Sequence, residues 1–135
     1  DGATSARELG DRDATVQVEI DPPRTRIFDL LGETKVLALP SQPRPRWREQ
    51  VGLPIVEGLG KGCLVVTTAE TGLAEWLEDH GHAIVAPSGD VDALSRALTA
   101  SLRDDRSPAD VLRDLPERDG RAEAERWIVD PAVAE

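Results

Sequence analysis

Residues Pro54–Thr67, PIVEGLGKGCLVVT, place a helix directly before a buried strand. Pro54 lacks an N–H group, which suits the first turn of a helix, and Gly62 suits the point where that helix closes. The continuous apolar run Cys63–Thr67 favours a strand that is buried on both faces. Strands of this kind are typical of a parallel sheet with helices on each side.

The same alternation of strand and helix continues in both directions along the chain. Strands are predicted at Thr15–Ile20, Lys35–Leu39, Cys63–Thr67 and His82–Ala86. Helices are predicted at Ala3–Arg12, Pro23–Leu31, Pro54–Lys61, Leu73–Asp79, Val91–Leu102, Pro108–Leu115 and Gly120–Ile128. The pattern indicates the α/β class with a Rossmann-like, doubly wound parallel sheet.

Two of these helices carry clear start signals. Asp90 is expected to cap the helix that begins at Val91, and Ser107 the helix that begins at Pro108. The first of the two should turn Leu94, Ala97, Leu98 and Leu102 inward. We expect a partial Rossmann-like domain over residues 1–104 and a helical extension over residues 105–135.

Composition excludes several classes of function. The chain has 135 residues and a net charge of −10, so it lacks the clustered cations that nucleic-acid binding requires. No apolar run is long enough to span a membrane, and the start does not have the pattern of a signal peptide. The absence of Met predicts a fragment or a processed product. With this charge and no such segments, we expect a cytoplasmic protein, either free or peripheral to the inner membrane face.

Cysteine and histidine give no sign of redox or metal chemistry. The single cysteine, Cys63, excludes an internal disulfide and opens an apolar strand, so a buried and inert thiol is expected. His80 and His82 flank Gly81 and are interpreted as loop and strand-start residues. The sequence predicts no metal site and no cofactor.

The Gly-Leu-Pro turn at the start of the predicted helix Pro54–Lys61 has one glutamate before it and one after it. Glu49 and Glu57 lie on either side of Gly52, Leu53 and Pro54. A helix that starts at Pro54 would direct N–H groups into the preceding loop, where they favour a phosphate. Glu57 is expected in the first turn of that helix. The alternative interpretation is a pair of solvated glutamates favoured by the positive end of the helix.

The spacing of these glutamates resembles the E-x7-E motif of family-4 retaining glycosyltransferases, in the nucleotide-sugar-binding C-terminal half of the GT-B fold. The flanking residues also agree with that family. Pro40 and Ser41 resemble its Pro-Ser strand end, Cys63–Thr68 its next strand, and Thr71–Glu75 its next loop and helix start. The resemblance extends from about Val16 to Leu102.

The resemblance implies transfer of a hexose from a nucleoside diphosphate sugar to an acceptor hydroxyl, with retention of configuration. Glu49 would contact the hydroxyls of the donor sugar as the catalytic residue, and Glu57 would accept hydrogen bonds from the ribose. The backbone N–H groups of Val51, Gly52 and Leu53 would lie against sugar and diphosphate. Val51 departs from the family, which usually has an aromatic residue there. The backbone near Glu19 to Asp21 would border the base.

The resemblance also implies parts that this sequence lacks. The family has a separate acceptor domain and an Arg/Lys pair against the diphosphate, and neither matches a segment of this chain. We therefore expect the 135 residues to be inactive alone. Arg44, Arg46 and Arg48 are candidates for phosphate contacts or are solvated loop residues.

Two other functions are consistent with an α/β chain of this size. One is a non-catalytic nucleotide-binding or assembly module derived from the same family. The other is a receiver-like signalling domain, which needs clustered acids at the strand ends. Only Asp21 stands at such an end, so that interpretation is poorly supported.

Overall fold

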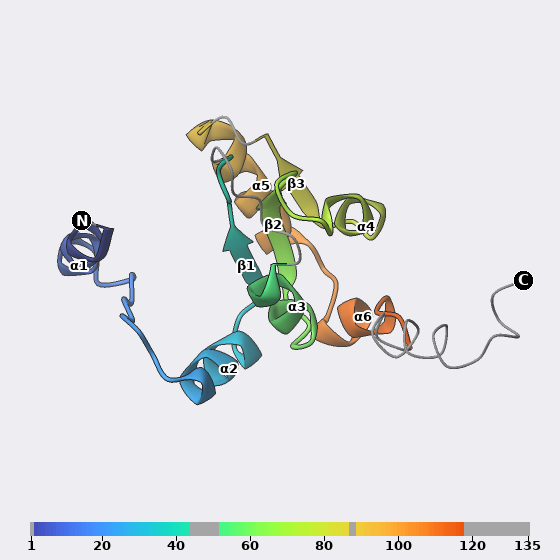
Figure 1. Ribbon diagram of the computed structural model, residues 1–135, viewed down its shortest axis with the longest axis horizontal. Coiled ribbons are helices and arrows are strands. Elements are labelled where there is room, and N and C mark those ends of the chain that lie inside the picture. Colours follow the sequence, from blue (N-terminus) through green and yellow to red (C-terminus); the bar gives the residue numbers. More distant parts are fainter. Residues whose placement is uncertain (1, 44–51, 87–88, 118–135) are drawn as a thin grey trace, which may run out of the picture. The chain divides into compact units, whose positions relative to one another are not determined.

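The computed structural model describes residues 2–43, 52–86 and 89–117 (Figure 1). The elements are α1 (Gly2–Arg12), α2 (Arg24–Gly32), β1 (Val36–Leu39), α3 (Leu53–Leu59), β2 (Leu64–Thr68), α4 (Ala74–Asp79), β3 (Ala83–Val85), α5 (Val91–Arg103) and α6 (Pro108–Arg113). The chain divides into two compact units between Glu33 and Thr34. The predicted helix at Gly120–Ile128 lies outside the described residues.

The second unit contains a three-stranded parallel sheet in the order β1-β2-β3. Val36 of β1 pairs with Leu64 of β2, and Val66 of β2 pairs with Ala83 of β3. The prediction that KVLAL and CLVVT are adjacent parallel strands is confirmed, and with it the α/β, Rossmann-like fold class.

Helices cover both faces of this sheet. Right-handed crossovers between neighbouring parallel strands place α3 and α4 on one face. Helix α5 contacts all three strands and passes behind them in Figure 1. Every residue of β2 is buried as a result. The core cluster consists of Ile55, Leu59, Leu64, Val65, Leu77 and Val111.

Both predicted helix caps are present. The Asp90 carboxylate accepts a hydrogen bond from the backbone N–H of Ala93 at 2.9 Å. Ser107 and Asp110 form a reciprocal capping box at the start of α6. The prediction that Leu102 turns inward is wrong: its side chain is 58% exposed. Leu102 lies in the last turn of α5, where its carbonyl oxygen accepts from Lys35 Nζ at 2.7 Å.

The first unit corrects the prediction of a strand at Thr15–Ile20. No strand is assigned there within the described residues. The Asp13 carboxylate accepts from the N–H of Thr15, and Val16 N–H donates to Asp13 O, which bends the chain as it leaves α1. Val18 packs on α1: its Cγ2 lies only 3.0 Å from the position that a Cβ at Gly10 would occupy. The alternation therefore reflects packing against a helix, with no neighbouring strand.

Gly62 joins α3 to β2 where α6 passes close by. Its φ is +79°, and a Cβ at this position would lie 2.6 Å from Pro108 Cβ. The observed α3 ends at Leu59, two residues before the predicted Lys61, because residues 60–62 form a turn. The start of α6 therefore packs directly against the turn that leads into β2. The predicted domain boundary at residue 104 remains a prediction.

We expect Gly62→Ala to destabilise the chain strongly, and Gly89→Ala to do so mildly. Gly89 has a similar φ of +70° but has nothing within 4 Å of the Cβ position. Both variants incur the left-handed backbone cost of about 1–2 kcal/mol. Only Gly62→Ala adds overpacking, of roughly 1–3 kcal/mol. Urea unfolding measures both, and equal losses would show that the approach of Pro108 does not matter.

Candidate functional site

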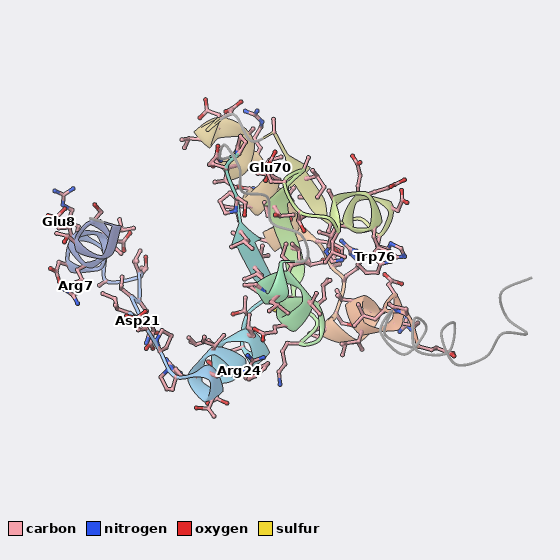
Figure 2. All side chains as sticks on the ribbon, viewed as in Figure 1. Arg7, Glu8, Asp21, Arg24, Glu70 and Trp76 are labelled. Atoms are coloured by element: carbon pink, nitrogen blue, oxygen red, sulfur yellow. The ribbon has the colours of Figure 1, made fainter. Side chains whose placement is uncertain are left out.

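The carboxyl ends of the strands, where ligands bind in open α/β sheets, form the candidate site. Residue Glu70 lies in the turn that follows β2, at this end of the sheet (Figure 2). At the same end, Pro40 and Ser41 follow β1, and Gly52 precedes α3. Of the sequence-predicted site residues, Gly52, Leu53 and Glu57 are described, whereas Glu49 and Val51 lie outside the described residues.

Buried threonines connect the strands at this end. Thr67 Oγ1 donates to Leu39 O at 2.8 Å, and Thr68 Oγ1 donates to Ser41 O at 2.7 Å. Both threonines are 0% exposed. Because unpaired polar groups are costly in such a place, the Thr67 hydroxyl stabilises the pairing of β2 with β1, and the Thr68 hydroxyl fixes the course of the chain after β1.

The start of α3 depends on Gly52. This residue is buried and has a left-handed backbone with φ 60° and ψ 63°. The N–H groups of Ile55 and Val56 donate to its carbonyl oxygen at 2.7 and 3.2 Å. Pro54 has no N–H, so of the first three helical positions only Leu53 has an N–H outside this internal pairing. The helix start therefore directs fewer donors into the loop than the sequence suggests.

Glu57 does not lie in the first turn, which corrects the sequence-based prediction. The helix begins at Leu53, so Glu57 is its fifth residue and belongs to the second turn. Its side chain is partly exposed. A ligand at the start of α3 would therefore meet Glu57 along the helix side, about one turn from the end.

The predicted base-binding segment belongs to the first unit. Glu19 forms an ion pair with Arg26 at 2.7 Å, and the hydrogen bond to this carboxylate raises the pKa of Arg26. Asp21 has a positive φ of 49°, which Asp tolerates better than most residues. This turn separates the extended segment from α2.

Other surface features of the described chain do not add a metal site. No cluster of three or more His, Cys, Asp or Glu side chains in the described ranges is arranged to hold a metal ion. No helix in those ranges is both long and apolar enough to cross a membrane. A cavity of about 400 Å³ lies between α3 and α4. Its lining is largely apolar: Val56, Leu59, Gly60, Leu73, Trp76, Leu115 and Pro116.

The opposite end of the sheet is braced by histidine and arginine. His82 is 7% exposed, and its Nδ1 accepts from the N–H of Val65 at 3.1 Å. Burial, with smaller contributions from nearby Arg106 and His80, lowers the pKa of His82 to about 4. Arg106 donates to the carbonyl oxygens of His80 and Gly81 at 2.8 and 2.6 Å and pairs with Asp104. Both histidines are structural, as the sequence indicated.

Cys63 has the buried, inert environment that the sequence predicted. Its thiol donates to Thr34 O at 3.3 Å, and burial raises its pKa. A raised pKa reduces the thiolate form, which is the nucleophile.

Comparison with known proteins identifies the family of this chain. Residues 2–104 match the family described as glycosyl transferases, group 1, which is more than half of the chain. The chain belongs to this family. The matched range includes both glutamates, the whole parallel sheet and the whole of α5. These residues therefore form a domain of a group 1 glycosyl transferase.

A curated relative gives a narrower comparison. The O-antigen chain mannosyltransferase B of Escherichia coli is 43% identical over 61 residues. The match covers 45% of this chain and 16% of the relative's length. Within the glycosyl transferase domain, the structure adds the side chains of Thr68 and Thr71 to the candidate site; the sequence placed Thr71 in a family-like loop but assigned neither side chain a role. The polar end of the run LVVTT was the available signal, since a strand buried throughout has little reason to end in hydroxyls.

The pKa of His82 predicts a loss of stability in mild acid. The folded state binds its proton only near pH 4, whereas an unfolded histidine titrates near 6.5. Stability is therefore full above pH 6.5 and falls as the pH decreases toward 4, by about 1.4 kcal/mol per pKa unit. Chemical unfolding between pH 7 and pH 4.5 measures this slope. His82→Asn keeps an acceptor near Nδ1 but cannot titrate, so its slope should be smaller; an unchanged slope would remove His82 as the cause.

Proposed function

We propose that this chain is the donor-binding part of a retaining glycosyltransferase that transfers a hexose from a nucleoside diphosphate sugar to an acceptor hydroxyl. The observation that carries the proposal is the family match over residues 2–104, which includes the complete E-x7-E stretch. The parallel sheet supports it, because its carboxyl end brings the β1–α3 segment and the β2–α4 turn together. We propose mannose as the hexose, since the relative with 43% identity is named a mannosyltransferase.

Each predicted residue has a role in this proposal. Glu49 is the catalytic residue that contacts the hydroxyls of the donor sugar. The backbone at Val51, Gly52 and Leu53 lies against sugar and diphosphate, and the left-handed Gly52 permits that close approach. Glu57 accepts hydrogen bonds from the ribose hydroxyls from the side of α3.

Leaving-group stabilisation is the main chemical task of such a site. Negative charge grows on the diphosphate as its bond to the sugar breaks, and fixed donors there lower the barrier. The described start of α3 supplies few N–H donors, so additional positive charge is required. We propose that residues outside this chain supply the acceptor site and a basic pair facing the diphosphate. These 135 residues would then bind the donor without completing the reaction.

The test of this proposal is the coupling between Glu57 and the ribose. Glu57→Gln keeps the shape but removes a charged acceptor, which should cost about 1–3 kcal/mol, roughly tenfold or more in affinity. Calorimetric titration of the protein with GDP and UDP identifies the preferred base. The 2′-deoxy form of that nucleotide should bind the wild type more weakly, whereas Glu57→Gln should barely distinguish the two.

Glu75→Gln is the matched control, because Glu75 is an exposed glutamate in the first turn of the neighbouring α4. It should retain the wild-type preference for ribose. If Glu57→Gln and the wild type discriminate equally between ribose and deoxyribose, Glu57 does not contact the sugar. If the protein binds neither nucleotide, the donor-binding function itself is wrong.

A further inference from the structure

Ser41 and Gly52, at the two ends of the connection between β1 and α3, both lie against the end of β2 and the turn that follows it. At the start of this connection, Thr68 Oγ1 donates to Ser41 O at 2.7 Å. At its finish, a Cβ at Gly52 would lie 3.4 Å from Thr71 Oγ1. Thr68 is the last residue of β2 and Thr71 lies in the turn that follows, three residues further along the sequence. Ser41 and Gly52, which are eleven residues apart, therefore both contact residues at or just after the end of β2.

The side chains of Thr68 and Thr71 are restricted in conformation. Thr68 is 0% exposed and Thr71 is 5% exposed, and β-branching restricts the side-chain rotamers of both. Thr68 Oγ1 also accepts from Glu70 N–H at 3.4 Å, and Thr71 Oγ1 accepts from Leu73 N–H at 3.3 Å. Each hydroxyl thus braces its own turn as well as facing the β1–α3 segment. Neither contact was evident from the sequence, because the partners are about 20 to 30 residues away.

We propose that Thr68 and Thr71 are positioning residues for donor binding, which fix where the β1–α3 segment leaves the sheet and where it enters α3. This inference rests on the proposed function, since that segment carries Glu49 and ends at Gly52. Neither threonine needs to touch the donor. Their effect is to keep Gly52, Leu53 and Glu57 in the arrangement that the donor meets, so that little order has to be gained on binding.

Thr67 provides an internal control of the same chemistry. It is also 0% exposed, and its Oγ1 donates to a main-chain carbonyl at 2.8 Å. Its acceptor is Leu39, however, which lies inside β1 and pairs with Thr67 in the sheet register. Loss of the Thr67 hydroxyl should therefore weaken the sheet without releasing the segment that follows it.

The experiment compares Thr68→Val, Thr68→Ser and Thr67→Val in the same protein. Valine keeps the volume and removes the hydroxyl, whereas serine keeps the hydroxyl. Thr68→Val and Thr67→Val should lower Tm by similar amounts. Calorimetric titration with GDP-mannose, or with whichever of GDP and UDP binds the wild type, should show a loss of about tenfold for Thr68→Val and little change for Thr67→Val. Thr68→Ser should bind close to the wild type.

A second measurement needs no ligand. Trypsin can cut after Arg46 and Arg48, both inside the β1–α3 segment. Mass spectrometry of timed digests should show faster cleavage at these two bonds in Thr68→Val than in Thr67→Val or the wild type, since proteolysis follows local opening.

These outcomes distinguish the positioning role of the threonines from the donor-binding function. If the wild type binds a nucleotide but Thr68→Val loses no more affinity than Thr67→Val, the positioning role is wrong and the donor function stands. Equal cleavage in the two valine variants also contradicts the positioning role. If the wild type binds none of the nucleotides, the donor function fails and the positioning role fails with it.

Discussion

Burial of β2 on both faces and along both edges is the constraint on which the second unit depends. All five residues of β2 are buried, with β1 and β3 paired to its edges and helices packed on its faces. At roughly 25 cal/mol per Å² of apolar surface, such a strand supplies much of the driving force for folding. A strand of this kind tolerates polar atoms only where each is hydrogen-bonded.

The change from apolar to polar along β2 locates the functional end of the sheet. Leu64, Val65 and Val66 contribute to packing, whereas Thr67 donates to the carbonyl oxygen of Leu39 in β1 and Thr68 to that of Ser41 just after β1. Thr68 therefore belongs to the buried strand and also holds the start of the chain that leaves β1. In the proposed function, stability and donor binding are coupled at this residue.

The sequence predicts most of the sheet, because continuous apolar runs such as CLVVT specify burial on both faces wherever they occur. It wrongly predicts a strand at Thr15–Ile20, a segment in which Val18 packs on α1. It also places Glu57 in the first turn, since Pro54 suggested the start of a helix that in fact begins at Leu53. The hydrogen bond from Thr68 to Ser41 depends on sheet register, which periodicity does not encode.

We propose that this chain binds a nucleoside diphosphate at the carboxyl end of its sheet. Titration of the isotopically labelled chain with GDP and UDP, followed by amide chemical shifts, tests that claim most directly and detects even millimolar affinity. We expect saturable shifts of the amides of Gly52, Leu53 and Thr71, whereas the amide shifts of Gly62 and Gly81, at the other end of the sheet, should not change. Saturable shifts confined to Gly62 and Gly81, or none with either nucleotide, would contradict it.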